Sequence, residues 1–176
     1  MRIVISGTHA SGKSTLIGDF SAAHPEYEVL PDPYELVDDA GDEPNAGLFL
    51  AQLGASARRL LEFERGARLI SERGPLDFLA YLSALDELGR PSRTGGHPAR
   101  AVEITIAAMA HVDLLVLVPL SRGIRVPEDE DPDLREAMDD ALLELADDPD
   151  LLAGCPVIEV VGDPADRLAQ LDAAVG

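Results

Sequence analysis

The sequence predicts a doubly wound α/β domain, in which a five-stranded parallel sheet carries helices on both faces. Short apolar runs suited to buried parallel strands alternate with longer stretches of helical periodicity. The chain has 176 residues, 46% of them hydrophobic, which is enough for one substantial core. Neither an internal repeat nor a low-complexity linker divides it. We therefore expect a single domain over residues 1–176.

The first predicted strand covers residues 2–6, where Ile3-Val4-Ile5 forms an apolar run. A helix is expected from about Lys13, with Leu16 and Phe20 on one face. It should end before His24-Pro25, because a residue that precedes proline avoids the α conformation.

A second strand is predicted over residues 26–30. It must end at Pro31-Asp32-Pro33, which cannot continue as a central strand. Over residues 45–65 the apolar positions recur with helical spacing, so a helix is expected there.

The third strand is predicted over residues 68–71 and is closed by Glu72-Arg73-Gly74. Pro75 suits the first turn of a helix, which should reach about Leu88. Residues 89–97 have the composition of a loop, and a further helix is expected over residues 98–110.

The clearest buried strand in the sequence is predicted over residues 113–118. An arginine-containing loop over residues 119–131 and an acidic helix over residues 133–146 should follow it. The last strand is predicted over residues 157–161, and Asp163-Pro164 should cap the final helix.

A phosphate-binding motif lies between the first strand and the first helix. Residues 7–15 satisfy the pattern G-x-x-x-x-G-K-[ST]. Glycine permits backbone angles that let successive amides face a phosphate chain, and the following helix adds the positive end of its dipole. We expect the nucleotide to contact Gly7, His9, Ala10, Ser11, Gly12, Lys13, Ser14 and Thr15.

Lys13 and Ser14 carry the chemistry of this motif. Lys13 should reach the β- and γ-phosphates of ATP, and the Ser14 hydroxyl should ligate Mg²⁺. Lys13 is also the only lysine in the chain, beside thirteen arginines. A composition that favours arginine has kept a flexible ammonium at the one position where a planar guanidinium would not serve.

The remaining site residues follow from the fold, because ligands bind beyond the carboxyl ends of strands in such sheets. This rule predicts that five segments meet there: residues 6–15, 31–35, 71–74, 119–125 and 162–164.

Acidic residues beyond the second and third strands are candidates for the acceptor and metal sites. Asp32 could accept a proton from an acceptor hydroxyl, with Glu35 as an alternative base, although aspartate beside prolines also forms turns. Glu72 could hold Mg²⁺ through water while Arg73 clamps a phosphate or orients the acceptor, or the two could form an ordinary ion pair. Asp77 and Tyr81, one helical turn apart, could line the acceptor pocket.

Arginines after the fourth strand predict a lid over about residues 119–146. Arg122 and Arg125 could neutralise charge on the transferring phosphoryl group and close over ATP, with help from Arg135. The alternative is an unconnected pair of surface arginines.

Composition excludes several other functions. The net charge of −19 argues against duplex nucleic acid and acidic membranes as partners, since both need clustered basic residues. Residues 127–150 carry twelve carboxylates and one arginine, which is typical of a solvated helix face.

Cys155 is alone and is expected to be structural. Without a signal peptide or a membrane-spanning run, the protein is expected to be cytoplasmic.

Three signatures give a resemblance to a known family. They are the phosphate loop, the segment Ser71-Glu72-Arg73 with its following helix and Ala80-Tyr81 pair, and Arg122-Gly-Ile-Arg125 with Arg135. Together they resemble the P-loop kinases of the nucleoside and nucleotide group, including thymidylate-kinase-like and AAA-type ATPase relatives. The resemblance implies a P-loop fold, ATP and Mg²⁺ as cofactors, and catalytic roles for Lys13, Asp32, Arg73, Arg122 and Arg125. The base-selecting residues of that group have no secure match in this sequence, so the resemblance leaves the acceptor open.

Two functions follow from these observations. The first is an ATP-dependent phosphotransferase that acts on a hydroxyl or phosphate of a nucleoside, nucleotide or other small metabolite. The second is a regulatory module that binds or slowly hydrolyses ATP and has a protein partner. A guanine-specific GTPase is disfavoured, because Asn-Lys-x-Asp needs a second lysine. The oligomeric state stays open, with a homodimer as one candidate.

Overall fold

The computed structural model describes residues 1–33, 45–64, 66–90, 99–120 and 131–176, and its described strands form one parallel sheet. The order across the sheet is β2-β3-β1-β4-β5. The strands are β1 (Arg2–Ser6), β2 (Glu28–Leu30), β3 (Leu69–Glu72), β4 (Leu114–Leu117) and β5 (Val157–Glu159). All four pairings are parallel, so every carboxyl end lies at the same edge. This confirms the predicted five-stranded parallel sheet.

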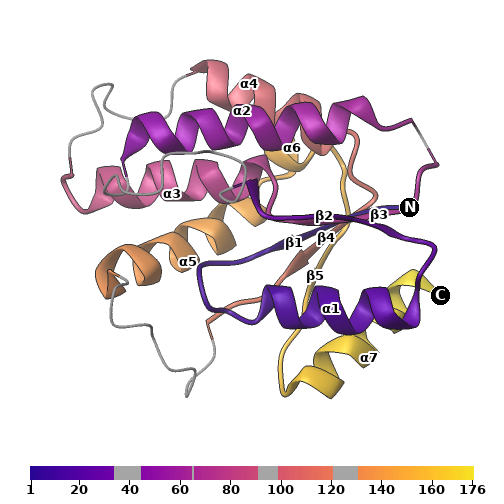
Figure 1. Cartoon of the computed structure of the whole chain (residues 1–176). Coiled ribbons are helices and arrows are strands. Elements are labelled where there is room, and N and C mark those ends of the chain that lie inside the picture. The colour runs from indigo at the N-terminus through magenta and orange to yellow at the C-terminus, as the bar shows by residue number, and fades with distance from the viewer. Residues whose placement is uncertain (34–44, 65, 91–98, 121–130) are drawn as a thin grey trace.

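Helices cover both faces of the sheet, as Figure 1 shows. On one face lie α2 (Ala46–Glu62), α3 (Pro75–Glu87), α4 (Ala99–Met109), α5 (Pro132–Ala146) and α6 (Pro149–Leu152). On the other face lie α1 (Lys13–Ala23) and α7 (Pro164–Val175). The predicted doubly wound architecture is therefore confirmed.

Two apolar clusters hold these layers together. One packs Val4, Leu69 and Leu115 of the sheet against the five helices on the first face. The other packs Ile3, Ile5 and neighbouring strand residues against α1 and α7. Because successive side chains of a strand point to opposite faces, the alternating residues of β1 serve both clusters. β1, at the centre of the sheet, is buried along its whole length, and it leads directly into the phosphate loop.

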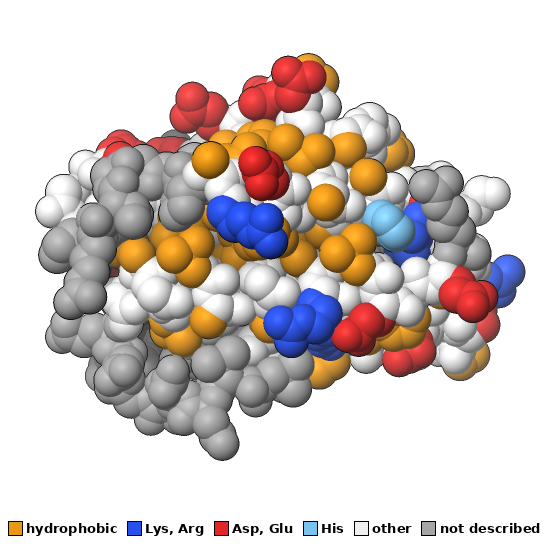
Figure 2. Space-filling view, turned by 90° about the horizontal axis from the view of Figure 1, so that it is seen from above, with side chains coloured by type: hydrophobic (Ala, Val, Ile, Leu, Met, Phe, Trp, Pro, Cys, Tyr) orange, Lys and Arg blue, Asp and Glu red, His pale blue; other side chains and the backbone are white. Residues whose placement is uncertain are grey.

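The outer surface of the larger helical layer is mixed in character. Figure 2 looks onto this layer from above and shows apolar side chains in patches between charged ones. Leu61 of α2 is the large apolar residue most exposed on these helices within the described ranges. None of the described helices is long and apolar enough to cross a membrane.

Most predicted boundaries differ from the structure by one to three residues. β2 starts at Glu28 rather than Glu26, and β5 ends at Glu159, because both are edge strands with a single hydrogen-bonded neighbour. The short helix α6 was not expected. Asp148 caps it by accepting from the backbone N–H groups of Asp150 and Leu151.

Candidate active site

The loop between β1 and α1 has a backbone shape that requires its two motif glycines. Gly12 has φ +100°, and a Cβ there would lie 2.7 Å from Nη1 of Arg167. A Cβ on Gly7 would lie 2.6 Å from the carbonyl oxygen of Val118, just after β4. Neighbouring atoms therefore occupy the space that a side chain would need at both positions.

Two hydroxyls inside this loop support an anionic ligand. Thr8 Oγ1 and Ser11 Oγ are buried, and neither has a hydrogen-bond partner within the described part of the chain. Buried donors without partners are rare in folded proteins and often mark a missing ligand or water. Phosphate oxygens are acceptors that would satisfy them, so the loop fits a nucleotide.

Lys13 begins α1 and folds back across the loop. Its side chain is buried, and its Nζ donates to the carbonyl oxygen of Thr8 at 2.7 Å. Burial, followed by the positive charge of Arg73, lowers the pKa of Lys13 to about 7, although Asp77, Glu72 and Asp32 act in the opposite direction. The negative charge of a bound phosphate chain would stabilise the ammonium form of Lys13.

Ser14 and Glu72 form a pair suited to Mg²⁺. The Ser14 hydroxyl donates to Oε1 of Glu72 at 2.8 Å. Ile5 pairs with Glu72 in the sheet, which places the end of β3 beside the phosphate loop. Hydroxyl and carboxylate oxygens are the donors that Mg²⁺ prefers when phosphates complete its shell. These two residues therefore fit the predicted metal site.

Arg73 and Asp32 form a second, deeper pair beyond the ends of β3 and β2. Arg73 Nε donates to Oδ2 of Asp32 at 2.7 Å, and Nη1 donates to the Tyr81 hydroxyl at 3.1 Å. Burial alone would lower the pKa of Arg73, but Tyr81, Asp32 and Asp77 together raise it. Tyr81 stacks on Phe49 of α2, with ring centroids 4.5 Å apart. The pair is thus held between β2, β3, α3 and α2.

Asp77 does not line an acceptor pocket, contrary to the sequence-based expectation. Its carboxylate is fully buried and accepts from the Ser6 hydroxyl, from the N–H of Gly7 and from the N–H of Gly74. Burial raises the pKa of Asp77, while Arg73 and these three donors lower it. Asp77 therefore contacts the start of the phosphate loop and the turn after β3, and its side chain is not exposed.

Two arginines that contact the phosphate loop were not assigned this position from the sequence. Arg135 of α5 donates through Nε to the carbonyl oxygen of His9 at 2.9 Å and through Nη2 to that of Ala10 at 3.4 Å. Arg167 of α7 donates to the carbonyl oxygen of Ser11 at 2.7 Å. Helices from opposite faces of the sheet therefore hold the same loop.

The structure places most, but not all, of the predicted site residues. Lys13, Ser14, Glu72, Arg73 and Asp32 come together at the carboxyl ends of β1, β2 and β3. Glu35, Arg122 and Arg125 lie outside the described residues, as does much of the predicted lid. The described part of that lid includes Leu120, whose N–H donates to both carboxylate oxygens of Asp139 on α5.

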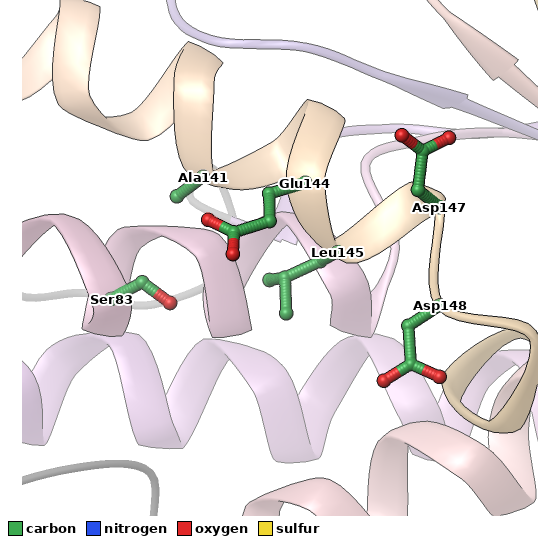
Figure 3. Close-up of a pocket in the computed structure, with 6 residues that line it drawn as sticks. All are labelled: Ser83, Ala141, Glu144, Leu145, Asp147 and Asp148. Atoms are coloured by element: carbon green, nitrogen blue, oxygen red, sulfur yellow. The ribbon is translucent and has the colours of Figure 1, made fainter.

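A hollow elsewhere on the molecule involves none of the predicted site residues. It measures about 340 Å³ and is lined by Ser83, Ala141, Glu144, Leu145, Asp147 and Asp148. Figure 3 shows the carboxylates of Glu144, Asp147 and Asp148, which run from the last turn of α5 to the start of α6. Their negative charge disfavours a phosphate group in this hollow.

Comparisons with known proteins agree with this fold. A model of a family described as an AAA domain matches residues 2–167. No curated protein sequence matches the chain. A structure of deoxyadenosine kinase from M. mycoides with dCMP and dCDP superposes with a TM-score of 0.71 at 16% identity, covering 99% of this chain and 98% of that one. A thymidylate kinase structure from Candida albicans gives a TM-score of 0.66 at 15% identity, covering 99% and 90%.

The family match spans nearly the whole chain, and the structural matches extend from end to end. They confirm the resemblance first suggested by the phosphate loop and by the Glu72-Arg73 segment. This chain therefore belongs to the AAA domain family, and its fold is that of the P-loop nucleoside and nucleotide kinases.

Proposed function

We propose that this chain is an ATP-dependent phosphotransferase that moves the γ-phosphoryl group to a hydroxyl or phosphate of a small molecule. One observation carries the proposal. The phosphate loop touches the acid-arginine segment through Ser14 and Glu72, and the next residue, Arg73, is paired with Asp32. A nucleotide-binding half and an acceptor-binding half therefore adjoin at one edge of the sheet.

In this mechanism the protein mainly positions groups and balances charge. Lys13 binds the β- and γ-phosphates. Ser14 and Glu72 would hold Mg²⁺, which would supply positive charge to offset that of the phosphate oxygens. Arg73 orients the acceptor or clamps its phosphate, and its bond to Asp32 fixes the guanidinium in place.

The bond changes are those of in-line phosphoryl transfer. The acceptor oxygen forms a bond to the γ-phosphorus while the bond to the β,γ-bridging oxygen breaks, which releases ADP. When the acceptor is a hydroxyl, its proton passes to the carboxylate of Asp32 or of Glu35. The Asp32 side chain keeps 16% of its surface exposed, so an acceptor can reach it. Arg122 and Arg125 are proposed to close over the phosphates and to offset the charge that develops in the transition state.

The fold neighbours support a proposal for the acceptor class. Their names specify deoxyadenosine and thymidylate, so nucleosides and nucleoside monophosphates are the first candidates. Other hydroxyl-bearing metabolites come next. The protein is further proposed to act in the cytoplasm, as a monomer or a homodimer, without duplex nucleic acid as a partner.

Phosphoryl transfer from labelled ATP to a panel of these acceptors tests the proposal. Wild-type protein with Mg²⁺ should phosphorylate at least one of them, and Lys13→Ala should phosphorylate none. ATP binding without any transfer would instead favour the regulatory module with a protein partner. Equal ATP affinity in wild type and Lys13→Ala would contradict the assignment of the phosphate loop itself.

A further inference from the structure

The carboxylate of Asp77 joins two segments that lie about seventy residues apart in the sequence. Its Oδ1 accepts from the N–H of Gly7 at 2.9 Å. Its Oδ2 accepts from the Ser6 hydroxyl at 2.6 Å and from the N–H of Gly74 at 2.8 Å. All these contacts are fully buried, where charge-assisted hydrogen bonds are strong and lost partners are costly.

The two joined segments are the starting points of the two halves of the site. Gly7 opens the phosphate loop that leads to Lys13 and Ser14. Gly74 follows Glu72 and Arg73, and Arg73 has the left-handed φ of +62° that turns the chain out of β3. The relative position of the two halves therefore depends on what links Gly7 to Gly74.

Helix capping alone does not account for Asp77. As the third residue of α3 it completes a capping box by accepting from the N–H of Gly74. Asp166 has the same position on α7 and accepts from the N–H of Asp163 at 3.3 Å, but it is exposed. The bonds from Asp77 to Ser6 and Gly7 go beyond this shared role, and they reach into β1 and the phosphate loop.

We infer that Asp77 is a positioning residue for phosphoryl transfer, which fixes the phosphate loop relative to the Glu72-Arg73 turn. This inference rests on the proposed function. Asp77 touches neither phosphate nor acceptor in this role. It acts through Gly7 and Gly74.

Asparagine at this position is a sharp probe because three donors converge on two oxygens. An amide has one acceptor oxygen and one NH₂ group, which only donates. Whichever way the amide is turned, its NH₂ group faces the N–H of Gly7 or that of Gly74. At least one of these two links must therefore open in Asp77→Asn.

Each half of the site keeps its own contacts in that variant. The phosphate loop retains the bonds from Lys13 to Thr8, from Arg135 to His9 and from Arg167 to Ser11. The β3 turn retains the bond from Arg73 to Asp32. MgATP should therefore still bind. Phosphoryl transfer should fail, because it needs the two halves of the site in their correct relative position.

The experiment compares wild type, Asp77→Asn and the matched capping variant Asp166→Asn. In Asp77→Asn, kcat per folded molecule should fall by about 10²-fold, the cost of a small misplacement of reacting groups, while the affinity for MgATP changes by less than about threefold. In Asp166→Asn both should stay within about twofold of wild type. If Asp77→Asn does not fold, Ser6→Ala is the second variant: it removes one bond to Asp77 and should lower kcat by a few-fold with MgATP affinity unchanged, whereas an unchanged kcat would count against the inference.

Amide hydrogen exchange at Gly7 and Gly74 provides a second readout that needs no acceptor. At least one of these two amides should lose protection in Asp77→Asn, and both should keep it in Asp166→Asn. If wild type transfers phosphate to no acceptor, the proposed function fails, and exchange alone then decides whether Asp77 links the segments. A parallel loss of kcat and ATP affinity, an effect no larger than that of Asp166→Asn, or unchanged protection at Gly7 and Gly74 would each overturn the inference.

Discussion

Among single residues, Lys13 has the charge state that folding disturbs most clearly. Its pKa falls from 10.5 to about 7, first through burial and then through Arg73. Between about pH 7 and pH 10.5 the unfolded chain binds more protons here than the folded protein, so the contribution of Lys13 to the free energy of unfolding rises with pH across that window. Below about pH 7 the buried charge destabilises the nucleotide-free protein in full.

Lys13→Met should therefore raise the thermal midpoint of the nucleotide-free protein at about pH 6.5. The gain should shrink at about pH 9.5, because wild-type Lys13 is then neutral in the folded state. Thermal unfolding of both proteins at both pH values checks this. An equal gain at the two pH values would show that Lys13 titrates outside the window.

Asp32 allows a test of the proposed general base. Asp32→Asn keeps the shape of the side chain and an oxygen that can accept from Arg73 Nε, but it removes the basic carboxylate. Transfer to a hydroxyl acceptor should fall by roughly 10²–10⁴-fold, while ATP affinity is retained. The thermal midpoint of the same sample shows whether the turn between Pro31 and Pro33 has survived. An unchanged rate in a folded variant would assign the role to Glu35 or Glu72.

Among the elements, α5 and α7 each donate arginine hydrogen bonds to carbonyl oxygens of the phosphate loop. Arg167→Ala removes the bond from α7 to the carbonyl oxygen of Ser11 and should weaken MgATP binding by about tenfold, the size expected for one charge-assisted hydrogen bond. Arg68→Ala is a suitable control, because Arg68 is exposed and pairs with Glu26 at the opposite edge of the sheet. Calorimetric titration with MgATP measures both. Equal affinities in the two variants would show that α7 does not shape the loop.

Local sequence patterns predicted the elements well, but their contacts only in part. The apolar runs of β1, β3 and β4, together with the glycines of the phosphate loop, were visible because each depends on neighbours within a few residues. Residues predicted from strand ends, such as Glu72 and Arg73, followed from a general rule of parallel sheets. The rule holds whatever the order of the strands.

The parts that could not be predicted depend on that order. Asp77 reaches Ser6 and Gly7 because β3 lies beside β1, and no local pattern reveals which strands are neighbours. Asp77 lies in the first turn of the helix that Pro75 begins, where an acidic residue is favoured, and this was the available hint. Arg135 and Arg167 bind loop carbonyls more than 120 residues away, and these contacts appear only in the folded chain. Help from Arg135 at the phosphates was expected, but not its bonds to the loop backbone.

For the molecule as a whole, nucleotide binding should appear as stability. The loop is joined to both helical layers through Arg135 and Arg167, so a ligand held there should stabilise the entire domain. MgATP at about 100 times its Kd would add about 2.7 kcal/mol. For a chain of this size that corresponds to a rise of roughly 5–10 °C in the thermal midpoint. Scanning fluorimetry with and without MgATP measures this rise in the thermal midpoint. Lys13→Ala should show no rise. The same rise in Lys13→Ala would mean that ATP binds elsewhere.

The burial of Lys13 has a practical consequence for following site occupancy. Lys13 holds the only side-chain amine of the chain, so reagents that acylate amines have just two targets, this group and the amino group of Met1. The lowered pKa leaves part of the Lys13 amine unprotonated at neutral pH, but the side chain is buried, so it reacts only when the loop opens. Bound nucleotide would hold the loop closed and return the amine to the ammonium form. The rate of acylation at Lys13, followed by mass spectrometry of the intact protein, would then fall as sites fill with nucleotide, with the Met1 adduct as the internal standard.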